Sequence, residues 1–156
     1  MSWDKAEKKA AYELLLLQQA GLLEAEDNWL ANLANSSALL NQTLKKTVFA
    51  GYYLFNGEEL ILGPFQGNVS CTRIKMGKGV CGESAAKEEI LIVPNVKEHA
   101  NYISCDGTAM SEIVVPMIKG GQLIGVLDID AGVTAMYDEI DQEYLEKYVA
   151  LLLGSN

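Results

Sequence analysis

The chain has 156 residues, 49% of them hydrophobic, which is enough for one buried core and short for two. Its 21 Asp and Glu residues exceed its 12 Lys and Arg residues, for a formal net charge of -9. So acidic a protein lacks the basic surface that binds phosphate backbones or anionic lipids. We therefore expect one domain over residues 1–156, with no nucleic acid and no membrane as partners.

The first 45 residues predict two helices. The apolar run Leu14–Leu17 has acids on both sides and no small-residue cleavage site, so it does not read as a signal peptide. It is also far shorter than the roughly 18 apolar residues of a membrane span. We interpret it as part of an amphipathic helix in a cytoplasmic protein. A second helix is indicated after Glu26, where leucines recur at helical spacing: Leu30, Leu33, Leu40 and Leu44.

Residues 46–132 predict about six short strands, mostly antiparallel, with active-site loops and a short helix. "TVFAGYYLF" and "EELIL" flank the turn Asn56–Gly57, which is typical of a hairpin. "VSCTRI" and "ILIV" read as single strands, while "SEIVVPMI" and "QLIGVLDI" pair across Gly120–Gly121. Asp138 is the expected N-cap of a closing helix within residues 137–153. The expected class is α+β, one sheet with helices from both ends of the chain packed on it.

The three cysteines, Cys71, Cys81 and Cys105, cannot all pair within one chain. Without a signal peptide they indicate a reducing compartment and no structural disulfide framework. The single histidine, His99, and the lack of CxxC or HxxxH spacing argue against a structural zinc site. We therefore expect no metal.

The segment "GKGVCG" matches the dinucleotide pattern G-x-G-x-x-G through Gly77, Gly79 and Gly82. Only about seven residues separate it from the next strand, whereas a parallel crossover needs a dozen or more. We therefore expect the glycines to shape a loop that presents Cys81. The segment "HANYISCDGTAM" is a long polar connection, which places Cys105 on a loop of the kind that often carries function.

The acids of "LDID" lie on one face of a strand, because side chains alternate with a period of two. Asp128 and Asp130 can then be the solvated side of an antiparallel sheet, or part of a functional cluster. If Glu112 joined them from the neighbouring strand, like-charge repulsion would raise a carboxyl pKa and keep a proton donor near neutral pH. A plain two-residue loop at Gly120–Gly121 would set Glu112 opposite Ile129, on the wrong face. We therefore predict an odd loop or a bulge that brings the three carboxyls together.

Several segments together resemble one family. They are "GPFQGNVSCTRIKMGKGVCGESAA", "VPNV", "SCDGTAMSEIVVPM" and "LIGVLDID", and they resemble the free methionine-R-sulfoxide reductases, which are stand-alone GAF domains. The likeness runs from Phe49 to Asp130 and includes the cysteine separations of 10 and 24 residues. It implies a GAF-like fold and thioredoxin-dependent reduction of free L-methionine (R)-S-oxide to L-methionine, without a cofactor. It leaves a homodimer open.

The resemblance also implies roles for the cysteines. Cys105 matches the nucleophile, Cys71 the usual resolving cysteine, and Cys81 a third cysteine that joins the disulfide relay. Attack by Cys105 on the sulfoxide, with protonation by a nearby acid, leaves a sulfenic acid that condenses with a second thiol. Whether Cys71 or Cys81 resolves first stays open.

The same resemblance implies a substrate pocket. Glu112, Asp128 and Asp130 match acids that bind and polarise the sulfoxide, with Glu112 and Asp130 also expected in catalysis. Tyr53 matches a pocket aromatic. Phe49 stands where many members have Trp, and its smaller ring predicts a weaker hold on the substrate's methyl group.

Two other functions fit the same residues. A ligand-sensing GAF domain would bind a small effector without turnover. A thiol redox switch would use the cysteines in response to peroxide and ignore methionine sulfoxide.

Overall fold

The computed structural model describes residues 3–154. Six strands form one antiparallel sheet with the order β3-β2-β1-β6-β5-β4. They are β1 (Thr47–Phe55), β2 (Glu59–Gly67), β3 (Arg73–Lys75), β4 (Leu91–Val93), β5 (Ser111–Lys119) and β6 (Gln122–Ala131). The predicted α+β class and the antiparallel sheet are confirmed.

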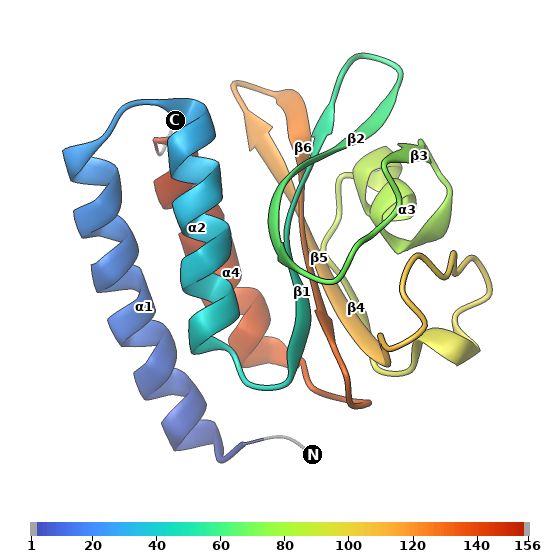
Figure 1. Ribbon diagram of the computed structural model, residues 1–156, viewed down its shortest axis with the longest axis horizontal. Coiled ribbons are helices and arrows are strands. Elements are labelled where there is room, and N and C mark those ends of the chain that lie inside the picture. The colour runs from blue at the N-terminus through green and yellow to red at the C-terminus, as the bar shows by residue number, and fades with distance from the viewer. Residues whose placement is uncertain (1–2, 155–156) are drawn as a thin grey trace.

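The helices lie on both faces of the sheet (Figure 1). One face is covered by α2 (Trp29–Thr43) and α4 (Glu139–Leu153), and α1 (Lys5–Ala25) packs on these two helices from outside. The other face carries α3 (Gly79–Lys87) and the long connections around it. Leu127 and Ile129 of β6 enter the core under the three helices, whereas Val126 belongs to a second core beneath α3. None of the helices in residues 3–154 is long and apolar enough to cross a membrane.

Capping and one buried ion pair fix the helical layer. Asp138 is the N-cap of α4, as predicted, and forms a capping box with Asp141. Lys8 of α1 is buried and donates to Asp141 at 2.6 Å. Because an unpaired buried charge is costly, this contact fastens the first helix to the last.

The β5–β6 hairpin contains the predicted irregularity. Gly120 and Gly121 both have positive φ, 58° and 78°, as a two-residue type I′ turn requires. Near this turn Ile118 pairs with Leu123, but one step further Met117 pairs with Gly125. Ile124 is therefore a bulge, and every pair beyond it is shifted by one residue. The predicted bulge between Glu112 and Asp128 is confirmed.

Candidate active site

Three carboxyl side chains meet on the sheet face that α3 covers. The bulge sets Glu112 of β5 opposite Asp130 of β6, and Asp128 lies two residues along β6 on the same face. Only 6% of Glu112, 4% of Asp128 and 8% of Asp130 is exposed. The alternative of a solvated sheet face is therefore wrong, because α3 and its loops bury these acids.

Burial changes the acidity of the cluster. The pKa of Glu112 and that of Asp130 lie well above their ordinary values, first through burial and then through the charge of Asp128. Burial also raises the pKa of Asp128, but hydrogen bonds from Glu112 and Cys81 oppose that rise. The three acids titrate as one coupled cluster, which therefore retains a proton that Glu112 can donate.

Two oxygen atoms in the cluster have no hydrogen-bond partner. Among residues 3–154, the Oδ1 atoms of Asp128 and Asp130 are buried and unpaired. A buried acceptor without a donor costs about 1–3 kcal/mol, so such atoms call for an explanation. A bound ligand that donates hydrogen bonds to these two oxygens would explain why they are unpaired in its absence.

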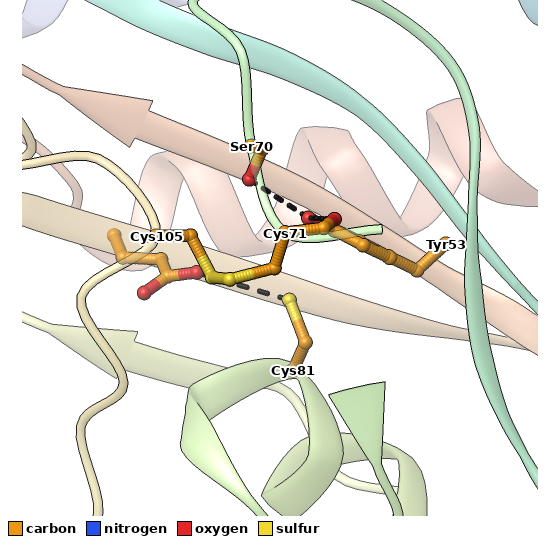
Figure 2. The surroundings of a disulfide bond; sticks show 6 residues. Tyr53, Ser70, Cys71, Cys81 and Cys105 are labelled. Carbon is orange, nitrogen blue, oxygen red and sulfur yellow. Dashed lines mark hydrogen bonds between the residues drawn. A yellow bond between two sulfur atoms is a disulfide. The ribbon is translucent and has the colours of Figure 1, made fainter. Parts of the chain in front are cut away.

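Cys71 and Cys105 form a disulfide, with 5.2 Å between their Cα atoms (Figure 2). Cys71 lies between β2 and β3, and Cys105 lies in the long connection after the 3₁₀ turn Val96–Glu98. The hydroxyl of Tyr53 lies 2.8 Å from Ser70 Oγ and donates to the Cys71 carbonyl at 2.9 Å. Tyr53 therefore anchors the Cys71 loop to β1.

Cys81 was expected on a loop, and this was wrong, because it lies in the first turn of α3. Positive φ at Gly77 and Gly79 shapes the turn that precedes the helix. At Gly82 a Cβ would lie 2.4 Å from the carbonyl oxygen of Lys75, so glycine lets α3 pack against the end of β3. The strands before and after α3, β3 and β4, lie at opposite edges of the sheet, so the segment is no parallel dinucleotide-binding unit.

The Cys81 thiol faces the acids. Its Sγ lies 3.9 Å from Glu112 Oε2. Burial, followed by the charges of Asp128 and Glu112, holds the pKa of this thiol well above its ordinary value. Cys81 is therefore a neutral thiol in the oxidised protein, and a poor nucleophile there.

A small cavity joins these groups. Its volume is about 30 Å³, and its walls include Tyr53, Cys81, Cys105, Glu112, Asp128 and Asp130. Phe49 lies outside this wall, where it stacks on Phe65 with 5.1 Å between ring centroids. The sequence interpretation missed Ser70, Tyr102, Ile103 and Asp106, which also line the cavity. Their signal was their position beside Cys71 and Cys105 in the chain.

The sheet order, with helices on both faces and a loop-covered pocket, defines the class of GAF domains. Residues 13–154 match the family of the same name, "GAF domain". GAF domain-containing protein A of Dictyostelium discoideum is 46% identical over 149 residues, which cover 95% of this chain and 94% of that protein.

Two further relatives are more specific. Free methionine-R-sulfoxide reductase of Saccharomyces cerevisiae is 43% identical over 93% of this chain and 85% of its own length. The X-ray structure of free methionine-R-sulfoxide reductase from Neisseria meningitidis in complex with its substrate superposes with a TM-score of 0.91 at 40% identity, covering 95% of this chain and 89% of that one. The chain therefore belongs to the GAF-domain family and, within it, to the free methionine-R-sulfoxide reductases.

Proposed function

We propose that the protein reduces free L-methionine (R)-S-oxide to L-methionine and is recycled by thioredoxin. One observation carries the proposal: the redox pair Cys71–Cys105 lies at a cavity whose opposite wall holds buried acids of raised pKa. Reduction of a sulfoxide needs these two groups together, a thiol nucleophile and an acid that protonates the departing oxygen. We further propose that residues 1–156 form one domain that acts in the cytoplasm, where thioredoxin keeps thiols reduced.

The catalytic cycle balances with these residues and an external dithiol. The Cys105 thiolate attacks the sulfoxide sulfur while Glu112 donates a proton to its oxygen. The oxygen passes to the cysteine sulfur, which releases methionine and leaves Cys105 as a sulfenic acid. The Cys71 thiol then displaces water from that sulfenic acid and forms the disulfide, which a thioredoxin dithiol reduces by exchange.

The unpaired oxygens indicate how the substrate is held. Asp128 is buried, lines the cavity and has an Oδ1 without a hydrogen-bond partner, so it suits the ammonium group of a free amino acid. A methionine residue inside a peptide has no such ammonium group. The buried setting of Asp128 therefore favours the free amino acid over a peptide-bound one.

The size of the cavity adds a condition. A volume of about 30 Å³ holds little more than a water molecule, and methionine sulfoxide is far larger. Substrate can enter only after the Cys71 and Cys105 loops separate. Reduction of the disulfide therefore both restores the nucleophile and opens the pocket.

The test is NADPH consumption coupled through thioredoxin reductase and thioredoxin, with the two epimers of free methionine sulfoxide and with a sulfoxide-containing peptide. We expect turnover of the free R epimer and little with the S epimer or the peptide. Dithiothreitol in place of thioredoxin, with methionine measured directly, separates a wrong reductant from a wrong substrate. Binding of the sulfoxide without methionine release would favour the sensor function. Oxidation by peroxide without any methionine release would favour the redox switch.

A further inference from the structure

Three groups that could ligate a metal converge beneath the disulfide. The Cys81 Sγ and one carboxylate oxygen each from Glu112 and Asp128 all lie within 4.8 Å of one another. Tetrahedral zinc bonds of about 2.3 Å to sulfur and 2.0 Å to oxygen place those two atoms about 3.5 Å apart. The Cys81 Sγ and Glu112 Oε2 are 3.9 Å apart, so a small side-chain adjustment would complete that geometry.

A second observation points to a cation. The unpaired Oδ1 atoms belong to Asp128 and Asp130, which are 4% and 8% exposed and line the cavity. None of the ion pairs formed within residues 3–154 includes Glu112, Asp128 or Asp130. The cavity of about 30 Å³ is large enough for one ion or water. The site thus has acceptors and room for a cation.

We propose that Cys81, Glu112 and Asp128 bind a thiophilic divalent cation of the zinc class. Zinc would displace the proton of the neutral Cys81 thiol to solvent as it binds. The resulting thiolate with carboxylates suits zinc, whose preference lies between soft and hard ligands. Water would fill the fourth position. Neither Cys71 nor Cys105 is needed, so the oxidised protein binds the ion as well. Spacing along the sequence did not indicate this site, because its ligands come from α3, β5 and β6.

The consequence for activity rests on the proposed function. The ion would occupy the acids that hold and protonate the sulfoxide, and it would therefore compete with the substrate. Zinc then becomes an inhibitor that acts on a thiol outside the catalytic disulfide.

The binding test uses the full-length oxidised protein and Co²⁺ as a spectroscopic probe. The chain has three cysteines and two of them form the disulfide, so any thiolate-to-cobalt charge-transfer band reports Cys81. We expect one equivalent of Co²⁺ to produce the band and Zn²⁺ to remove it. Cys81→Ser should abolish it. Glu112→Gln and Asp128→Asn keep the thiol and should weaken Co²⁺ binding by at least about tenfold.

The matched control is Glu83→Gln, which removes a carboxylate two residues from Cys81 that pairs with Lys87 and His99 instead. It should leave the band and its midpoint unchanged. A wild-type protein without the band would overturn the proposal, as would a band that survives in Cys81→Ser.

The activity test separates the two proposals. Zn²⁺ should raise the KM for methionine sulfoxide, because both would occupy the same acids in the reduced enzyme. A cobalt band in a protein that turns over no sulfoxide would contradict the proposed function and leave the metal site standing. Turnover that is insensitive to Zn²⁺, in a protein without the cobalt band, would contradict the metal site and leave the proposed function standing.

Discussion

The Asn68 side-chain amide donates a hydrogen bond to Asp106 Oδ2 at 2.9 Å and so joins the loop of Cys71 to the loop of Cys105. The same amide lies 3.1 Å from Thr108 Oγ1, and the Asn68 backbone N–H donates to the carbonyl of β1 residue Val48. Asp106 follows Cys105 directly, and Asn68 precedes Cys71 by three residues. We call these Asn68 contacts the clamp. The clamp holds the Cys71 and Cys105 sulfurs within bonding reach of each other, without any contribution from the buried carboxyl cluster.

We predict that Asn68→Ala slows formation of the disulfide by about ten- to a hundredfold, because a displacement of about 1 Å in reacting groups can cost that much. Release of the first methionine should keep its wild-type rate, since Asn68 does not line the cavity. Asn68→Asp should be slower still, because it places a negative charge beside Asp106. Rapid quenching followed by mass spectrometry distinguishes the thiol, sulfenic acid and disulfide forms.

The matched control is Asn32→Ala, which removes an asparagine amide bonded to the Glu26 carbonyl in the helical layer. It should change neither step. If Asn68→Ala slowed methionine release as much as disulfide formation, the clamp would instead shape the substrate pocket.

The amount of methionine released in a single turnover should distinguish the roles of the cysteines. Cys105→Ser should release no methionine, because the attacking sulfur is gone. Cys71→Ser should release about one methionine per enzyme and then stall, either as a sulfenic acid or as a disulfide to Cys81. Free methionine measured against enzyme concentration checks both. Stoichiometric methionine from Cys105→Ser would reverse the assignment of nucleophile and resolving cysteine.

The strands and the acidic cluster were predictable because they depend on local rules. Alternation along β6 put Asp128 and Asp130 on one face, and the parity of the Gly120–Gly121 turn required a bulge for Glu112 to join them. The position of that bulge, at Ile124, was not predictable. β6 pairs with β1 as well as with β5, and sequence spacing does not specify both registers at once.

The position of Cys81 could not be predicted from the sequence. The pattern of Gly77, Gly79 and Gly82 is compatible with a loop and with the start of a helix. The close approach of Gly82 to Lys75 decides between them, and it arises only when α3 lies on the sheet. Burial of the acids likewise depends on that docking, so the choice between a solvated face and an active site needed the structure.

The buried acids should make stability fall with pH. A carboxyl whose pKa is raised by folding binds its proton more tightly in the folded state. Its favourable contribution is complete below the unfolded pKa and is lost as pH rises through the folded value. Glu112→Gln removes one such group, so we expect it to raise the free energy of unfolding at pH 8. Thermal unfolding of the oxidised protein between pH 5 and pH 8 measures the difference.

Glu83→Gln is the control of opposite sign. Hydrogen bonds from His99 and Lys87 lower the pKa of Glu83, so its charge favours folding above the unfolded pKa. This variant should give no gain in stability at pH 8. If Glu112→Gln also gave no gain in stability at pH 8, the ionised Glu112 side chain would not destabilise the folded state.

The last prediction concerns the proton that leaves with the sulfoxide oxygen. Glu112 has a pKa well above the ordinary value and so remains an acid near neutral pH. The rate of sulfenic acid formation should therefore fall as pH rises through that raised pKa, because the donor is then lost. Glu112→Gln should slow this step by roughly ten- to ten-thousand-fold, the range of general acid catalysis, and should flatten the alkaline decline.

Asp130→Asn should also slow the step but keep the decline, since Glu112 still titrates in that variant. Single-turnover methionine release between pH 6 and pH 10 gives both profiles. A Glu112→Gln enzyme with the wild-type rate and an unchanged alkaline limb would assign the proton donor to another group.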